Sequence, residues 1–256
     1  MSNMHTILLV GGQSSRFNDY NRVANQKPKS LGLIDKETLI AHVIKNFSKY
    51  NYNNFILPLG YYNDEFIKYF NKLKKIGNKK CNIFLIKSKY LKLSILKNDE
   101  INIFFLNTGK LTNKAERICK VINLLKLDEF IVSYGDAVGN VNLKKVNRIH
   151  KNSKSFVTGV GMIMKSQYGH YSINKQNIAT EIIEKPTINK LVNIGYFFFK
   201  KEAINYFIKY KNFDLEEGVI KKLVQKKKVI IYEHKKFWKS IDTLKDLNEL
   251  KIHLNN

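Results

Sequence analysis

Short, unbroken apolar runs alternate with segments of helical periodicity through the first half of this chain. The runs are ILLV (7–10), NNFILPLG (53–60), CNIFLI (81–86), INIFFL (101–106) and FIVSYGD (130–136). Runs of this kind are typical of strands that are covered on both faces. Apolar residues recur every three or four positions in the segments 37–50, 64–73 and 112–125. This β-α-β-α order predicts an α/β fold with a doubly wound, mostly parallel sheet.

Closely spaced strands replace this alternation from about residue 140 onward. The strand-like segments are SFVTGVGMIM (155–164), YGHYSI (168–173), NIATEIIEK (177–185) and LVNIGYFFF (191–199). Helical patterns return at 201–210, 215–225 and 242–254, with the strand VIIYEH (229–234) before the last of them. We expect the four strands to form a mixed-sheet extension over the functional site. No internal repeat or low-complexity linker divides the chain, so we expect a single domain over residues 1–256.

Three polar residues stand where helices are expected to begin. Asp64 and Thr112 precede apolar residues at helical spacing, and each is predicted to cap its helix. Asp242 precedes TLKDL at the start of the last helix. One interpretation makes Asp242 a helix cap, and another makes it a metal ligand.

Composition and charge exclude several classes of protein. The chain carries a formal net charge of +24, which favours anionic partners, but its lysines are spread thinly and no RRM, KH or zinc-finger pattern is present. We therefore expect no nucleic-acid partner. No apolar run approaches the roughly 20 residues of a membrane helix, and the start MSNMHTILLV lacks a basic signal-peptide region. We expect a cytoplasmic protein with no membrane partner, in which Cys81 and Cys119 are buried apolar residues.

The first apolar run ends in the segment GGQSSR (11–16), which has little side-chain bulk. Ligands of α/β proteins bind at the carboxyl ends of parallel strands, and this loop lies at such an end. Gly11 and Gly12 allow backbone N–H groups to approach an anion closely. Ser14 and Ser15 add hydroxyl donors, and Arg16 offers a planar fork that matches phosphate oxygens. The loop is neither a Walker A motif nor a GxGxxG motif, and we interpret it as a polyphosphate site rather than a plain turn with a surface arginine.

A second basic segment, QKPKS (26–30), follows shortly after this loop. Pro28 restricts the backbone between Lys27 and Lys29. Either lysine could point back at the phosphates, although a KPK segment by itself is usually a solvated loop.

These two segments together resemble the signature of the sugar-1-phosphate nucleotidyltransferase family, a GGxGTR-type loop followed by a PKxx segment. The resemblance continues in order along the chain. The matching segments are GYYNDEFIKYF (60–70), FIVSYGDAV (130–138), IIEKP (182–186), LVNIGYFFF (191–199), LEEGVIKKL (215–223) and FWKSIDTLKDL (237–247). Within the family, YGHYSI and FWKSIDTLKD are most similar to glucose-1-phosphate cytidylyltransferases.

The resemblance implies a fold, a reaction and a set of site residues. The fold is the Rossmann-like nucleotidyltransferase fold. The reaction is transfer of a nucleoside monophosphate, with CMP favoured, from a nucleoside triphosphate to a sugar 1-phosphate such as glucose 1-phosphate, with Mg²⁺ as cofactor. The product would be a nucleotide sugar for surface polysaccharide biosynthesis, and a homo-oligomer is left open.

Residue by residue, the resemblance assigns four groups of positions. The catalytic residues are Arg16, Lys29 and Lys185. The nucleotide-binding residues are Val10, Gly11, Gly12, Ser14, Ser15, Arg16, Lys29, Thr108 and Gly109. The sugar-phosphate-binding residues are Tyr168, Gly169, Glu184, Lys185, Asn193 and Gly195. The metal ligands are Asp136 and Asp242.

The chain also departs from the family pattern. Ser14 and Ser15 replace Gly-Thr, and Ser30 stands where proline is usual. The segment LTNKAER (111–117) replaces the family's Thr-Gly-Gly-Arg, which leaves the base and the roles of Lys114 and Arg117 open.

Other interpretations use the same residues. Asp136 could be a turn residue, and Glu184 with Lys185 could be an ordinary exposed pair. The rival functions are a metal-dependent glycosyltransferase and a nucleotidyltransferase for another phosphorylated acceptor.

Overall fold

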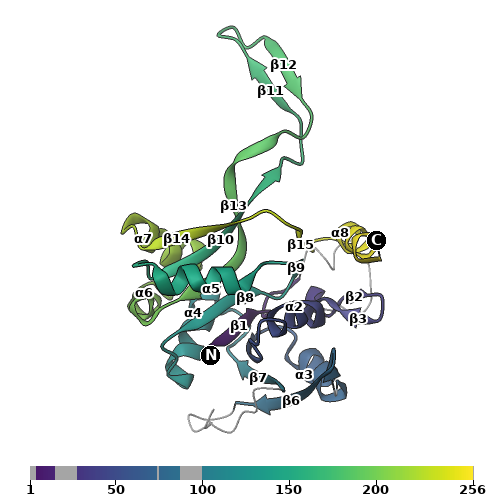
Figure 1. Cartoon of the computed structure of the whole chain (residues 1–256), viewed down its shortest axis with the longest axis vertical. Helices are drawn as coiled ribbons and strands as arrows, with labels where there is room; N and C mark the ends of the chain where they lie inside the picture. The colour runs from purple at the N-terminus through teal and green to yellow at the C-terminus, as the bar shows by residue number, and fades with distance from the viewer. Residues whose placement is uncertain (1–3, 15–27, 74, 87–99, 256) are drawn as a thin grey trace.

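A nine-stranded sheet forms the centre of the molecule in the computed structural model, which describes residues 4–14, 28–73, 75–86 and 100–255 (Figure 1). Its strands are β1 (His5–Leu9), β4 (Asn54–Leu59), β5 (Lys75–Ile76), β6 (Lys79–Leu85), β7 (Ile101–Asn107), β8 (Phe130–Tyr134), β10 (Val157–Lys165), β13 (Thr187–Phe199) and β14 (Val229–His234). Their order is β14-β10-β13-β8-β1-β4-β7-β6-β5. The run β8-β1-β4-β7-β6 is parallel throughout, whereas β13 is antiparallel to both of its neighbours. The predicted doubly wound, mostly parallel sheet is confirmed.

Helices cover both faces of this sheet. One face carries α2 (Leu39–Ser48), α3 (Asn63–Lys72), α5 (Leu143–Asn152) and α8 (Leu244–Asn255), which share one buried core with the sheet. The other face carries α4 (Lys114–Leu125), α6 (Ile204–Tyr210), the π-helical turn η4 (Glu216–Ile220) and α7 (Lys221–Gln225), which share a second core. No helix among the described residues is long and apolar enough to cross a bilayer.

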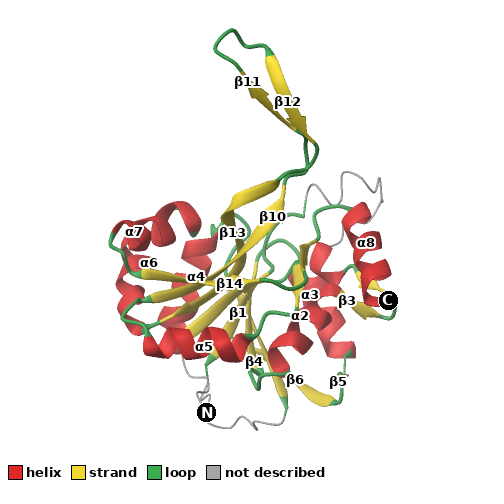
Figure 2. Ribbon diagram, turned by 45° about the horizontal axis from the view of Figure 1, so that its top comes forward, coloured by secondary structure: helices red, strands yellow, loops and turns green. Residues whose placement is uncertain are grey.

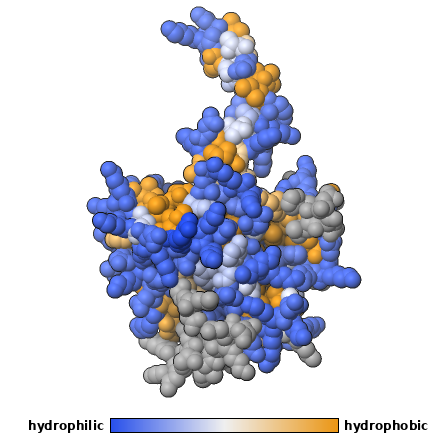
Figure 3. Space-filling model, viewed as in Figure 1, coloured by the Kyte–Doolittle hydropathy of each residue, from blue (hydrophilic) through white to orange (hydrophobic). Residues whose placement is uncertain are grey.

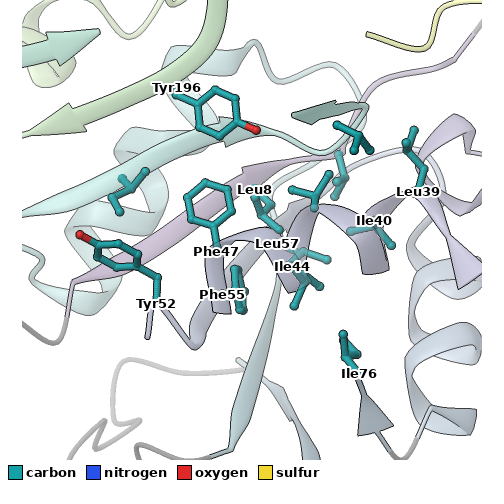
Figure 4. Close-up of a cluster of buried hydrophobic side chains, with 14 of the residues drawn as sticks. Leu8, Leu39, Ile40, Ile44, Phe47, Tyr52, Phe55, Leu57, Ile76 and Tyr196 are labelled. Atoms are coloured by element: carbon teal, nitrogen blue, oxygen red, sulfur yellow. The ribbon is translucent and has the colours of Figure 1, made fainter. Parts of the chain in front are cut away.

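Helix α2 shows how the apolar periodicity becomes packing. Ile40, Ile44 and Phe47 face the sheet, where they meet Phe55 and other strand residues (Figure 4). All of these side chains are fully buried, and each contributes on the order of 2 kcal/mol of transfer free energy. The spacing read from the sequence therefore fixes the face that α2 turns to the sheet.

Several shorter helices and strands lie outside the nine-stranded sheet. They are η1 (Lys29–Leu31), β2 (Leu33–Ile34), β3 (Glu37–Thr38), β9 (Ala137–Gly139), β11 (His170–Ile173), β12 (Ala179–Ile183), η3 (Lys201–Ala203) and β15 (Trp238–Ser240). The strands form the pairs β2-β3, β9-β15 and β11-β12. The β11-β12 hairpin projects away from the rest of the molecule (Figure 2).

Two predicted helix caps are wrong. Helix α3 begins at Asn63 after Tyr62, so Asp64 lies inside the first turn, where its charge complements the helix dipole without capping it. Helix α4 is capped by Asn113, whose side chain accepts a hydrogen bond from the backbone N–H of Glu116. The hydroxyl of Thr112 donates instead to the Thr108 carbonyl at 2.6 Å.

The two cysteines are buried and free, as predicted. Burial raises the pKa of the Cys81 thiol to about 12. The neutral thiol is therefore the form present at neutral pH, which agrees with a role as a packed apolar residue.

Two buried histidines make the fold sensitive to acid. Burial lowers the pKa of His5 to about 4, and burial together with Lys200 and Lys151 lowers the pKa of His150 to about 4. Between the ordinary value of about 6.5 and pH 4, the unfolded chain binds protons that the folded chain does not bind. The free energy of unfolding should therefore fall as the pH falls through this window, by about 3 kcal/mol for each histidine.

Urea unfolding at pH 7 and near pH 4.5 measures this loss. His150 lies 3.0 Å (Nδ1) from the Thr158 hydroxyl, so His150→Asn can keep that contact while removing the titrating ring. The variant should lose less stability than the wild type over the same pH interval. Replacement of the exposed His170 by asparagine serves as the control. Equal losses in wild type and His150→Asn would contradict the assignment.

Candidate active site

A cleft of about 550 Å³ opens at the carboxyl ends of the parallel strands. Four loops line it: the loop after β1, the loop between β4 and α3, the loop between β7 and α4, and the segment after β8. Lys29, Ser30, Asp214 and Asp242, from other parts of the chain, complete it. The residues that line it are Leu9, Val10, Gly11, Gly12, Gln13, Ser14, Lys29, Ser30, Tyr61, Lys110, Leu111, Thr112, Asn113, Lys114, Arg117, Tyr134, Asp136, Asp214 and Asp242. The cleft lies at the edge of the sheet where α/β proteins bind their ligands.

The loop after β1 forms one wall of this cleft. Val10, Gly11, Gly12 and Ser14 all line it, so the described part of the predicted phosphate loop faces the cavity. Two neighbouring segments hold the loop in place. The Tyr62 hydroxyl donates to the Gln13 carbonyl at 2.8 Å, and the Lys29 N–H donates to the Ser14 hydroxyl at 3.1 Å. The predicted residues Ser15, Arg16 and Lys27 lie outside the described residues.

Arg117 on helix α4 supports this wall from below. Arg117 is 5% exposed as a residue, and its guanidinium donates to the carbonyls of Leu59 (2.9 Å), Gly11 (3.2 Å) and Lys110 (3.1 Å). Gly11 and Lys110 lie in the loops after β1 and β7, and Leu59 is the last residue of β4. Arg117 therefore joins these two loops to the end of β4, and its role in the structure is to position them.

Two glycines, Gly11 and Gly60, leave room for the guanidinium of Arg117. A Cβ on Gly11 would lie 2.6 Å from Arg117 Nη1, and one on Gly60 would lie 2.5 Å from Arg117 Nη2. Both distances are too short for any side chain. The glycine loop thus has a structural requirement of its own, because it must pass close to the buried arginine.

The predicted nucleotide-binding residues Thr108 and Gly109 lie beside the Arg117 hydrogen bonds that hold the wall of the cleft. The Thr108 hydroxyl donates to the Leu59 carbonyl at 2.7 Å and accepts from Arg117 Nη1 at 2.6 Å. Gly109 has a φ of +96° and donates its N–H to the Asn107 side chain. Neither residue lines the cleft, whereas the next residues, 110–114, do. The segment that departs from the family pattern is thus a wall of the cavity.

Asp136 and Asp242 are brought together by a short antiparallel pair of strands. β9 follows Asp136 and β15 precedes Asp242, and Ser240 pairs with Ala137. Lys29 lies between the two carboxylates, with its Nζ 2.6 Å from Asp136 and 3.0 Å from Asp242. Burial favours the neutral form of Lys29, but the two carboxylates outweigh it and raise the pKa of its ammonium group.

The carboxylate of Asp242 is not used as a helix cap. Helix α8 is capped by Thr243 and Asp246: the Asp246 carboxylate accepts from the Thr243 N–H at 2.9 Å, and the Thr243 hydroxyl accepts from the Asp246 N–H at 3.2 Å. This reciprocal pair is a capping box. The side chain of Asp242 is therefore left to face Lys29 and the cleft.

The two aspartates fit a magnesium ion. Both carboxylates contact one cationic group, Lys29 Nζ, so they face a common point. Mg²⁺ prefers oxygen ligands and is commonly held by one or two carboxylates, with substrate phosphates and water completing its shell. No cluster of three or more His, Cys, Asp or Glu suited to a metal occurs among the described residues. The donor set is thus right for a magnesium ion shared with a phosphorylated substrate.

A cluster that the sequence did not predict forms the opposite wall. Lys114 Nζ lies 2.8 Å from the Asp214 carboxylate, 2.7 Å from that of Glu216 and 3.3 Å from the Tyr134 hydroxyl. The Tyr134 hydroxyl in turn donates to Glu216. Burial, together with the charge of Glu216, raises the pKa of Tyr134, so its hydroxyl stays a donor at neutral pH. The carboxylates outweigh burial at Lys114 and raise its pKa, so it stays charged.

Sequence signals for these unpredicted residues were weak. The chain has only four arginines (Arg16, Arg22, Arg117 and Arg148) among 45 basic residues. An arginine in so lysine-rich a chain indicates a position that needs the planar guanidinium, because lysine cannot form the same fork of hydrogen bonds. No comparable signal marks Tyr61, Tyr134 or Asp214.

None of the six predicted sugar-phosphate residues lines the cleft, although Gly195 packs against Tyr134, which does. Gly195 lies against the ring of Tyr134, where a Cβ would be 2.2 Å from Tyr134 Cδ2, and its N–H donates to the Asn193 side chain. Tyr168, Gly169, Glu184 and Lys185 flank the β11-β12 hairpin and do not line the cavity. Nine residues of largely extended chain separate Lys185 from Gly195, which corresponds to roughly 30 Å along the chain.

A family model and several known proteins match most of this chain. A model of the family described as "Nucleotidyl transferase" matches residues 5–256. A probable glucose-1-phosphate cytidylyltransferase of Bacillus subtilis is 29% identical over 96% of this chain and 94% of that protein. A glucose-1-phosphate cytidylyltransferase of Salmonella typhimurium is 23% identical over 95% of this chain and 93% of that protein.

Solved structures show the same fold. The crystal structure of HddC from Yersinia pseudotuberculosis complexed with GMP-PN superposes with a TM-score of 0.65 at 18% identity. The superposition covers 98% of this chain and 99% of that chain.

Proposed function

The chain belongs to the nucleotidyl transferase family, and from this premise we propose that it transfers CMP from CTP to glucose 1-phosphate, giving the nucleotide sugar and pyrophosphate. Transfer of a nucleotidyl group to a sugar 1-phosphate follows from the family and from relatives named as glucose-1-phosphate cytidylyltransferases. The choice of cytosine as the base and of glucose as the sugar is the more specific part of the proposal. They rest on relatives that are 29% and 23% identical to this chain.

One observation carries the proposal for this site. The glycine loop, Lys29 and the pair Asp136 and Asp242 come from distant parts of the sequence and meet in one cleft. A triphosphate needs donors and fixed positive charge around it, and a magnesium ion needs oxygen ligands beside it. The cleft offers both within the reach of a single nucleotide.

In the proposed reaction an oxygen of the sugar phosphate attacks the α-phosphorus of CTP. The bond from that phosphorus to the bridging oxygen breaks, and pyrophosphate leaves with the electron pair. The protein's contribution is to bind two polyanions and hold them in line. The N–H groups of the glycine loop and the Lys29 ammonium would bind the phosphates. The resemblance assigns Lys185 to the sugar phosphate, but in this structure Lys185 lies at the base of the β11-β12 hairpin, outside the cleft.

Asp136 and Asp242 would hold the magnesium ion. The ion would neutralise charge that develops on the phosphate oxygens. Lys29 contributes its own positive charge at the same place, since it already contacts both carboxylates. We also propose a cytoplasmic location and a role in making nucleotide sugars for surface polysaccharides.

A panel of substrates tests the proposal. CTP, UTP, dTTP, GTP and ATP would each be combined with several sugar 1-phosphates and Mg²⁺, and pyrophosphate release would be measured. We expect the highest kcat/KM for CTP with glucose 1-phosphate. Preference for another base or sugar would correct the specificity, and no turnover with any pair would overturn the proposed reaction.

A further inference from the structure

The ammonium group of Lys29 lies between the two aspartates of the cleft. Its Nζ is 2.6 Å from the Asp136 carboxylate and 3.0 Å from the Asp242 carboxylate. Of the basic side chains in the described part of the chain, Lys29 alone forms an ion pair with either aspartate. Nζ therefore fills the space between the two carboxylates, which is also the place proposed for the magnesium ion.

Lys29 differs from lysines on the outside of the molecule. The surface seen in Figure 3 is largely hydrophilic, as expected of a chain with 45 basic residues. Ion pairs of solvated lysines on such a surface contribute little, because water and salt screen them. The side chain of Lys29 is only 21% exposed, and those of Asp136 and Asp242 are 25% and 40% exposed. The contacts of Lys29 with the two aspartates are therefore screened less.

Lys29 and a magnesium ion compete for the same carboxylates. Two carboxylates that face a common point repel each other, and a cation between them removes the repulsion. Lys29 supplies one positive charge there, whereas Mg²⁺ supplies two and binds carboxylate oxygens at about 2.0–2.1 Å. An ion held by both aspartates would stand so close to Nζ that the two cations repel strongly. Lys29 must therefore leave the aspartates before both of them can bind the ion.

The position of Lys29 gives its ammonium group a second destination. The Lys29 N–H donates to the hydroxyl of Ser14 at 3.1 Å, and Pro28 restricts the backbone on the other side. Ser14 belongs to the glycine loop, where the triphosphate is proposed to bind. The four-carbon stem of lysine is flexible, so the ammonium group can turn from the aspartates to bound phosphates while the backbone stays in place.

We infer that Lys29 is the resident cation of the aspartate pair in the nucleotide-free protein, and that the triphosphate draws it away from Asp136 and Asp242. The affinity of the nucleotide-free protein for magnesium is then reduced by the fraction of molecules in which Lys29 has left the aspartates. Magnesium binds tightly only together with the nucleotide. Lys29 is thus a positioning residue for the metal site as well as a phosphate contact. This inference rests on the proposed function, since it takes the two aspartates as metal ligands.

Titration of the nucleotide-free protein with Mg²⁺ tests this inference, with calorimetry and Tm as the readouts. Lys29→Met removes the charge but keeps an unbranched side chain, and it should bind Mg²⁺ at least about tenfold more tightly than the wild type. Mg²⁺ should therefore raise the Tm of Lys29→Met more than that of the wild type. In the double variant Lys29→Met with Asp136→Asn, the gain in affinity should be lost.

Two matched variants separate the effect of charge from the effect of substitution. Lys29→Arg keeps a positive charge between the aspartates and should bind Mg²⁺ as weakly as the wild type. Lys110 lines the same cleft but forms no ion pair with Asp136 or Asp242 among the contacts of the described residues. Lys110→Met should therefore keep the wild-type affinity for Mg²⁺.

Circular dichroism would show that each variant is folded, and Lys29→Gln gives the same comparison if Lys29→Met does not fold. Equal Mg²⁺ affinities in the wild type and Lys29→Met, both lost on Asp136→Asn, would overturn the inference and leave the aspartate site in place. If Lys29→Met binds Mg²⁺ no more tightly than the double variant, the aspartate pair is not a magnesium site. That result would overturn the metal part of the proposed function as well.

Discussion

Replacing Asp136 by asparagine should lower kcat at least about a hundredfold, with little change in thermal stability. Asp136 lies in the cleft, 2.6 Å from Lys29, and is the proposed magnesium ligand that directly follows β8. Asparagine keeps the size of the side chain but removes the charge that a magnesium ion and Lys29 both use. Because a transition-state interaction is lost, kcat and kcat/KM should fall together. Steady-state rates of pyrophosphate release measure both.

The matched control is Asp128→Asn. Asp128 is an exposed aspartate that precedes β8, at the opposite end of the strand from Asp136. The same substitution there should leave kcat at the wild-type value. An Asp136→Asn variant that turns over at the wild-type rate would remove Asp136 from the proposed site.

Replacing Arg117 by methionine should weaken both the fold and nucleotide binding. The change leaves the carbonyls of Gly11, Leu59 and Lys110 and the Thr108 hydroxyl without their charged donor. The expected loss is about 3 kcal/mol of unfolding free energy, which corresponds to a fall in Tm of roughly 10 °C. Since the loops after β1 and β7 lose their common support, KM for the nucleoside triphosphate should rise about tenfold.

The split between KM and kcat distinguishes positioning from stability alone. At a temperature where the variant is fully folded, a purely structural arginine would leave KM unchanged. Arg117→Lys keeps one positive charge, but a single ammonium group cannot contact the carbonyls of Gly11, Leu59 and Lys110 together. It should therefore restore stability only in part. Arg148→Met, at an exposed arginine of α5, should change neither KM nor Tm. A normal KM in folded Arg117→Met would show that the loops keep their shape without it.

Much of the fold could be predicted from the sequence because burial imposes a periodicity. Strands covered on both faces must be apolar at every position, as ILLV and FIVSY are, and helices on one face of a sheet must be apolar every three or four residues. Their alternation also places strand ends together, so the glycine loop and Asp136 were expected at one edge. The helix caps at Asp64 and Thr112 were predicted wrongly: α4 is capped by Asn113, one position after Thr112, and α3 begins at Asn63 without a side-chain cap.

The walls of the site could not be predicted from the sequence, because they are formed by contacts between distant segments. Nothing near Arg117 in the sequence indicates that its partners are Gly11, Leu59 and Lys110, because those carbonyls meet only when β1, β4 and β7 lie side by side. The cluster of Lys114, Tyr134 and Glu216 is assembled in the same way from three separate elements.

By itself the sequence determined which segments become strands or helices and which strand ends carry small, hydroxyl and charged residues, because local periodicity and residue type suffice for both. Tertiary structure alone decided that Asp242 faces Asp136 across Lys29 rather than capping a helix, through the pairing of β9 with β15 and a cap supplied by Thr243 and Asp246. It also placed Lys185 at the base of the β11-β12 hairpin instead of in the cleft. The physical reason is that a side chain's partner is fixed by how the strands cross and pair, and no local pattern records that.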